Sequence, residues 1–284
     1  MYVDSIILTI CILTVAIIVS WIAYLTEYYK LPYKKFIGQK INFFNVFLSF
    51  LMFFTIYIVV TPVIFQLLIH SKYLKKNQTT VMSIIQALSF IFVSATLLTC
   101  NTHNKSISIK RLFKDNLFPN SKSFINDIKD VFITVIVSFP VILTTSHISD
   151  IITTVFIGEI DKEQIAIKYL KSMLNSNLNL TIAVFLILIG APLLEEYLFR
   201  GLLQTWLRKK LGSIYAILIT SICFAFFHYS NSQGLLNIPL IFTLFILSIY
   251  LGLIYEKSRS LFSSIFLHVT FNLINVIKII FTER

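Results

Sequence analysis

The fold of this chain is decided by one stretch, Leu180–Trp206, which reads LTIAVFLILIGAPLLEEYLFRGLLQTW. About 20 apolar residues are enough to cross the hydrocarbon of a bilayer, so this stretch predicts a transmembrane helix. Two adjacent glutamates, Glu195 and Glu196, stand in its middle. A charge at the centre of a membrane helix costs roughly 2.5–3.5 kcal/mol on insertion scales. We therefore expect these carboxylates to face a polar cavity or a partner, the simpler alternative being an ion pair that serves packing alone.

The composition of the whole chain agrees with this stretch. Of 284 residues, 57% are hydrophobic and 13% are charged, and the mean hydropathy is +0.83. Soluble domains carry about 25% charged residues, so this composition excludes a water-soluble enzyme, a secreted disulfide scaffold and a free nucleic-acid binder. The net charge of +11 indicates basic cytoplasmic loops rather than a nucleic-acid partner. The sequence predicts an all-α, polytopic membrane helical bundle in a lipid bilayer.

The whole sequence contains eight apolar segments, and we predict about eight transmembrane helices. None shows the alternation of apolar and polar residues typical of membrane strands, which favours helices over a β-barrel. Proline within the second and fourth segments predicts kinks. The eight segments are Ile6–Leu25, Phe43–Ile69, Val81–Cys100, Val131–Ile148, Leu180–Trp206, Ile214–Tyr229, Ile238–Tyr255 and Leu261–Phe281.

Charge in the loops predicts the orientation in the membrane. Loops after odd-numbered segments hold 15 basic residues, and the opposite side holds 8. The positive-inside rule therefore places the odd loops in the cytoplasm and both termini outside. The mixed stretch 148–179 predicts a short amphipathic interfacial helix in its second half. We divide the chain into N-terminal transmembrane helices without motifs, 1–157, and a core that contains Glu195 and Glu196, 158–284, within one continuous membrane domain.

Helix geometry separates the two glutamates. Arg200 follows Glu196 by four residues and lies nearly on its face, whereas it follows Glu195 by five and lies well off that face. We expect Arg200 to neutralise Glu196. A buried carboxylate that no cation of its own helix neutralises has a stronger affinity for a proton, which suits a general base. Glu195 is therefore the candidate base.

Two histidines lie at a depth where they could meet these carboxylates. His228 follows the basic turn near Gly212 by about 16 residues, and Glu195 precedes that turn by about as many. In an antiparallel helical hairpin the two fall at nearly the same level. His268 enters from the same side, with Asn272 one turn deeper. Taken singly, each histidine is more typical of a satisfied core residue. If the end of the fifth segment protrudes into water, all these groups can meet in one polar layer.

The residues of this layer resemble a known family. Glu195-Glu196-x-x-x-Arg200, Phe224-x-x-x-His228 and His268-x-x-x-Asn272, in that order on successive membrane helices, are similar to the three motifs of the CAAX-protease and bacteriocin-processing (CPBP, or Abi) family of intramembrane endopeptidases. The resemblance covers roughly Leu180–Asn275, and no motif position departs from the pattern.

The resemblance implies a helical bundle with a catalytic cavity inside the membrane, open toward the cytosol. It implies that Glu195 and His228 activate a water molecule and that His268 and Asn272 bind or polarise the oxyanion. Glu196 with Arg200 would shape the site. The substrate would be a membrane-associated peptide or protein tail at the cytosolic leaflet: a prenylated CaaX tail, a pheromone precursor, a bacteriocin leader and a signal-like helix all remain open. The implied location is the cell membrane, multi-pass.

The sequence leaves open whether the protein uses a metal and whether it is an enzyme. Zinc is possible, with Glu195, His228 and His268 as ligands, because catalytic zinc has three protein ligands and an open position. HExxH is absent, and the family has been described both as metallopeptidases and as metal-independent glutamate peptidases. A non-catalytic membrane scaffold or a bacteriocin self-immunity protein on the same fold is the alternative to an enzyme. A transporter is a third possibility, since buried Glu and His also relay protons.

Overall fold

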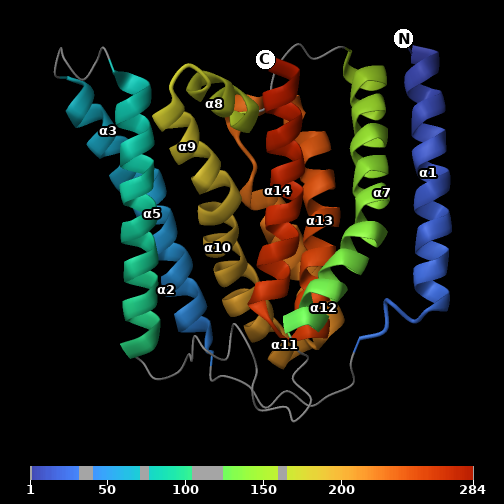
Figure 1. Ribbon diagram of the computed structural model, residues 1–284. Coiled ribbons are helices and arrows are strands. Elements are labelled where there is room, and N and C mark those ends of the chain that lie inside the picture. Colours follow the sequence, from blue (N-terminus) through green and yellow to red (C-terminus); the bar gives the residue numbers. More distant parts are fainter. Residues whose placement is uncertain (1, 32–40, 71–76, 104–123, 159–164, 284) are drawn as a thin grey trace. The chain divides into compact units, whose positions relative to one another are not determined.

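The computed structural model describes residues 2–31, 41–70, 77–103, 124–158 and 165–283, and these are almost entirely helical, with no strand among them (Figure 1). Seven helical stretches of the described chain are long and apolar enough to cross a membrane. Many large apolar side chains on them are exposed, as expected for helices that face lipid. The predicted all-α polytopic fold is confirmed.

The predicted segments agree closely with these stretches. Ile6–Leu25 and Phe43–Ile69 coincide with the predicted bounds, and the fourth predicted segment is longer, spanning Ile125–Phe156. The sixth, Ser213–Phe227, is a helix but is shorter than the seven long spans. Because most of the basic loop residues used to predict orientation lie outside the described residues, the predicted orientation stays a prediction.

The chain packs as two compact units, each built from segments far apart in the sequence. Unit 1 contains residues 1–36, 112–164 and 207–267, and unit 2 contains residues 37–111, 165–206 and 268–284. These units follow packing, whereas the predicted boundary between 157 and 158 follows the position of the motifs. That boundary stays a prediction.

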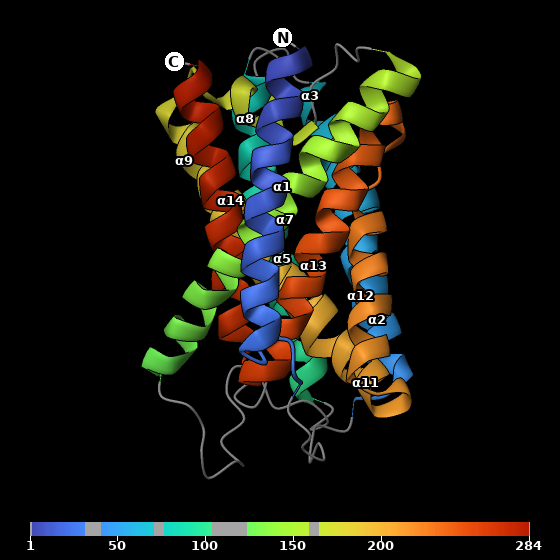
Figure 2. The same cartoon turned by 90° about the vertical axis from the view of Figure 1, so that its right-hand side faces the viewer.

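Unit 1 is organised around one central helix. The helix α13 (Asn237–Ser258) packs against α7 (Phe124–Ile157) and α12 (Ser213–Phe227), and α1 (Tyr2–Leu25) packs against α7 (Figure 2). A short 3-10 helix, η4 (Asn231–Leu236), leads into α13. The hairpin before α12 turns at Gly212, whose φ of 84° favours glycine, so the predicted basic turn is confirmed there.

Polar contacts fix one end of unit 1. The guanidinium of Arg208 donates to the carboxylate of Glu256 at 2.9 Å, and both side chains are buried. The ammonium of Lys257 donates to the carbonyl of Tyr28 at 2.6 Å and lies 3.8 Å from the centre of its ring. These charge-assisted contacts tie the end of α13 to segments before α7 and before α12.

Unit 2 consists of two helical walls and a short helix beside them. One wall is α2 (Phe43–Phe54), the π-helical segment η1 (Thr55–Val60) and α3 (Thr61–Ile69), packed against α5 (Gln78–His103). The other is the long span of α9 (Asn177–Phe185), η2 (Leu186–Gly190), α10 (Ala191–Glu196), η3 (Tyr197–Gln204) and the start of α11 (Thr205–Leu211). The short helix is α8 (Ile165–Met173), and residues 268–283 of α14 (Leu261–Glu283) complete the unit.

The short helix α8 docks through its apolar face. Leu170 and Met173 are buried in a cluster with Ala183 and Val276, and Lys168 and Lys171 belong to the same helix. A helix with one apolar face and basic residues is the predicted amphipathic helix of stretch 148–179, and its presence is confirmed. The acidic residues Glu159, Asp161 and Glu163 lie outside the described residues.

Candidate active site

The helix that carries the two glutamates has an unusual backbone. Two π-helical segments, η2 and η3, flank the six-residue helix α10, at whose end Glu195 and Glu196 lie. In a π turn each N–H bonds the carbonyl five residues earlier, and such turns occur frequently at functional sites. The hydroxyl of Thr205 donates to the carbonyl of Arg200, also five residues earlier, at 2.9 Å. The helix around the glutamates is therefore locally widened, and the hydroxyl of Thr205 supplies a hydrogen bond to the Arg200 carbonyl.

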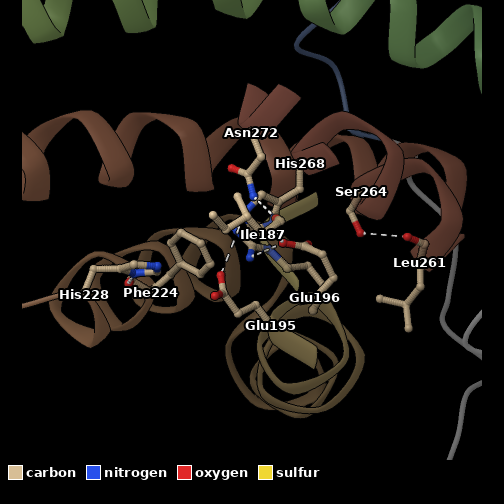
Figure 3. A network of polar contacts seen from close by, with 10 residues as sticks. Ile187, Glu195, Glu196, Phe224, His228, Leu261, Ser264, His268 and Asn272 are labelled. Atoms are coloured by element: carbon tan, nitrogen blue, oxygen red, sulfur yellow. Dashed lines mark hydrogen bonds and ion pairs between the residues drawn. The ribbon is translucent and has the colours of Figure 1, made fainter. Parts of the chain in front are cut away.

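Glu196 is the centre of a buried polar network in unit 2. Its Oε1 accepts from Nη1 of Arg200 at 3.0 Å and lies 2.9 Å from Nδ1 of His268 (Figure 3). Glu196 and Arg200 are 0% exposed. Two charges this deep are tolerated only when they are paired and hydrogen-bonded. The predicted i,i+4 pairing of Arg200 with Glu196 is present.

The same network fixes the orientation of the His268 imidazole. A carboxylate paired with a guanidinium can only accept, so Nδ1 of His268 carries the proton and donates to Glu196. The opposite ring nitrogen, Nε2, then lies 3.9 Å from Oε2 of Glu195. This separation is too long for a direct hydrogen bond, but it brings a second carboxylate to the reactive edge of the ring. Glu195 and His268 thus face each other, as predicted.

Asn272 lies one turn after His268, and its amide binds the backbone of the glutamate helix. The Nδ2 group donates to the carbonyl of Ile187 at 2.9 Å. In the π register of η2, the N–H of Ala191 bonds the carbonyl of Leu186, so the next donor would belong to Pro192. Proline has no N–H, and Asn272 supplies the missing donor. One of the two amide hydrogens of Asn272 has this structural task, which the sequence did not predict.

Replacing Asn272 by leucine tests that task. The carbonyl of Ile187 would lose its side-chain donor inside the protein, and an unsatisfied buried group costs about 1–3 kcal/mol. We expect the free energy of unfolding to fall by roughly that amount. Thermal or urea unfolding of the purified protein in detergent measures it. The matched control is Leu273→Ala on the exposed side of the same helix, which should change little. Equal stability of the Asn272→Leu variant and the parent would contradict this role.

His228 belongs to unit 1 and ends α12. Its Nδ1 lies 2.9 Å from the carbonyl of Phe224, which can only accept, so Nδ1 carries the proton. Its ring lies 4.9 Å from that of Phe224 and 5.4 Å from that of Phe227, measured between centroids. The imidazole is thus held by its own helix in the tautomer that leaves Nε2 as an acceptor. Because Glu195 belongs to unit 2, the meeting of His228 with Glu195 stays a prediction.

Glu195 also lines a cavity within unit 2. The cavity has a volume of about 480 Å³ and lies between η1 and α3, α5, and the stretch from η2 to α10. Sequence reasoning assigned no role to the second and third apolar segments, so it missed this wall. The only signal was polar groups, Tyr57 and Gln86, inside apolar segments, which is too common to single them out. The residues on this wall include Phe53, Tyr57, Met82, Ile85 and Gln86.

The three predicted zinc ligands, Glu195, His228 and His268, have some features of a metal site. A histidine that binds a metal usually donates its other ring nitrogen to a carboxylate or a backbone carbonyl, and His268 and His228 both do so. Of the three predicted ligands, Glu195 and His268 belong to unit 2. No three His, Cys, Asp or Glu side chains gather as a metal site among the residues that the structure describes. Because His228 belongs to unit 1, the three-ligand zinc set stays a prediction.

Comparison with known proteins agrees with this site. The family model described as type II CAAX prenyl endopeptidase Rce1-like matches residues 177–274, which contain all three motifs. The match confirms the resemblance to the CAAX-protease and bacteriocin-processing family that the motifs indicated. Searches of the curated proteins and of the solved structures found no match.

Proposed function

We propose that this chain, which carries the Rce1-like endopeptidase match over residues 177–274, is an intramembrane endopeptidase that hydrolyses a peptide bond of a membrane-associated peptide or protein tail. One observation supports this most strongly. A buried histidine, oriented by Glu196 and Arg200, presents Nε2 to a second carboxylate, Glu195, at the edge of a cavity. A base, an imidazole and room for a substrate are the parts that water-mediated hydrolysis needs.

In the proposed reaction Glu195 is the general base. It takes a proton from a water molecule whose oxygen attacks the scissile carbonyl, and Nε2 of His228 shares this task. The carbonyl oxygen becomes an oxyanion as the new carbon–oxygen bond forms. When the carbon–nitrogen bond breaks, the proton held by Glu195 passes to the leaving nitrogen. A base placed in this way contributes about 10²–10⁴-fold to the rate.

His268 and Asn272 are the proposed oxyanion partners. In the proposed reaction the His268 imidazole also carries a proton on Nε2 and donates it toward the oxyanion, while Nδ1 donates to Glu196. Asn272 uses one amide hydrogen for Ile187 and keeps a second one for the substrate. Glu196 and Arg200 act as positioning residues, because they contact His268 and each other rather than the reacting atoms.

The site is proposed to open toward the cytosol, in a multi-pass protein of the cell membrane. The basic excess in the odd loops supports this orientation. Seven described helical stretches that are long and apolar enough to cross a membrane support a substrate that lies in or at the bilayer.

A Glu195→Gln variant separates the possible functions. We expect it to insert and fold normally and to release no peptide product, which supports the peptidase. If the variant retains the full cellular phenotype, a scaffold or self-immunity protein on the same fold is the better account. If solute or proton flux into proteoliposomes changes while neither protein cleaves a peptide, the protein is better described as a transporter. Treatment with a chelator, followed by added zinc, tests in the same preparation whether cleavage depends on a metal.

A further inference from the structure

The cavity beside Glu195 has walls of two chemical kinds. Its surface is mainly apolar and aromatic, contributed by three helical stretches of unit 2. Four residues with polar side chains interrupt it: Tyr57, Thr61, Gln86 and Glu195. The hydroxyl of Thr61 already bonds the carbonyl of Ile56 and the hydroxyl of Ser89. A concave apolar site with a few polar groups is the usual form of a ligand pocket, and its volume of about 480 Å³ falls in the range of such pockets.

The amide of Gln86 is held in one orientation. The hydroxyl of Tyr169, on the amphipathic helix α8, donates to Oε1 of Gln86. The opposite end of the amide, Nε2, therefore carries the donors that remain for a carbonyl in the cavity. Burial raises the pKa of the Tyr169 phenol, so this donor keeps its proton at physiological pH.

Tyr57 and Glu195 place the reacting end of the cavity. Both side chains line it, from η1 and from α10. Tyr57 lies in η1, directly before the Thr61-Pro62 pair, just as η2 precedes Ala191-Pro192 on the opposite wall. Two widened helical turns thus face the same space. Anything that fills the cavity lies against the proposed general base.

Resting on the proposed function, we propose that this cavity is the substrate subsite that binds one large apolar side chain flanking the scissile bond. Its volume holds such a side chain together with the adjoining backbone. A hydrocarbon chain alone would need no hydrogen-bonding groups, whereas the Tyr57 hydroxyl and the Gln86 amide are donors suited to peptide carbonyls. An acidic side chain is rejected, because Glu195 repels it and the apolar wall does not solvate it.

Two cavity-filling variants test this subsite. Met82→Trp fills it from α5, and Ala191→Leu fills it from α10, on opposite walls. Ala95→Leu, at an exposed position of α5 outside the cavity, is the matched control. Peptides released from membranes of cells producing each full-length protein are sequenced by mass spectrometry. Only peptides that disappear with Glu195→Gln are counted as products.

The expected result is a change of sequence preference rather than a loss of all cleavage. The parent and Ala95→Leu proteins should cut beside Phe, Leu, Met or Ile. Either filled variant should lower cleavage beside these residues roughly 10- to 100-fold relative to cleavage beside Ala or Gly, since one large apolar side chain loses its place. The flanking position whose preference changes identifies the side of the bond that the cavity binds.

Three outcomes overturn the subsite. If the cavity-filling variants fold and keep the parent's preference for residues beside the cleaved bond, the cavity does not bind the substrate side chain. A lipid chain retained on the products at the flanking position, in place of an apolar side chain, assigns the cavity to that lipid. Products whose flanking residues are mainly charged contradict it as well. In each case Glu195-dependent cleavage persists, so the proposed function stands. If the parent releases no Glu195-dependent peptide, the proposed function itself fails.

Discussion

Replacing Glu195 by glutamine is expected to lower the rate of peptide cleavage by about 10²–10⁴-fold, because glutamine has the same shape but cannot accept a proton from water. The side chain lies at the edge of a cavity and not at the centre of the buried ion pair, which Glu196 occupies. The exchange should therefore affect chemistry more than folding. The measurement is the initial rate with purified protein in detergent, on a peptide that the parent cleaves.

Glu27→Gln is the matched control for this exchange. Glu27 is an exposed carboxylate at the end of α1, in a surface ion pair with Lys30. The same chemical change there should leave the cleavage rate unaltered. Thermal unfolding of both variants shows whether the folded protein is intact. A Glu195→Gln protein that cleaves within a few-fold of the parent would remove Glu195 from the role of general base.

Replacing Arg200 by methionine is expected to destabilise the protein by about 3–5 kcal/mol, because it leaves the Glu196 carboxylate buried without its cation. The pair is 0% exposed on both sides, so solvent does not screen it. Urea or thermal unfolding in detergent measures the change. Lys30→Met, which removes the cation of the exposed Glu27 pair, is the control and should have little effect.

A second exchange should restore most of the stability that Arg200→Met removes. In the double variant Arg200→Met with Glu196→Gln, the buried carboxylate is replaced by a neutral amide that still accepts from Nδ1 of His268. Its stability should lie well above that of Arg200→Met alone. If the double variant is as unstable as the single one, or if Arg200→Met behaves like Lys30→Met, the ion pair does not have the structural role inferred here.

Much of the fold could be predicted from hydropathy, because in lipid every spanning backbone must satisfy its own hydrogen bonds. The spans Ile6–Leu25 and Phe43–Ile69 follow directly from their apolar runs. The pairing of Arg200 with Glu196 follows from helical spacing alone. The approach of His268 to Glu195 follows from its depth, since Glu195 had to find its partner on another helix. The contact of His268 with Glu196 was not predicted, because Arg200 was expected to neutralise that carboxylate.

Backbone irregularity could not be predicted in the same way. Proline at 62 and 140 predicted kinks, but the π segments η1, η2 and η3 have no simple pattern in the sequence. The bond from Asn272 to Ile187 depends on one of these segments, so it was missed as well. The cavity depends on how α5 and η1 pack against α10, which is a property of tertiary contact rather than of any segment.

Cleavage in isotopically labelled water shows whether Glu195 drives hydrolysis of a peptide bond. Membranes containing the parent or the Glu195→Gln protein are incubated in H₂¹⁸O, and both the released peptides and the fragments retained in the membrane are analysed by mass spectrometry. The parent should yield fragments whose new carboxyl ends carry one ¹⁸O atom, and the variant should yield no such fragments. Labelled fragments in equal amounts from both proteins, or from neither, would contradict this role of Glu195.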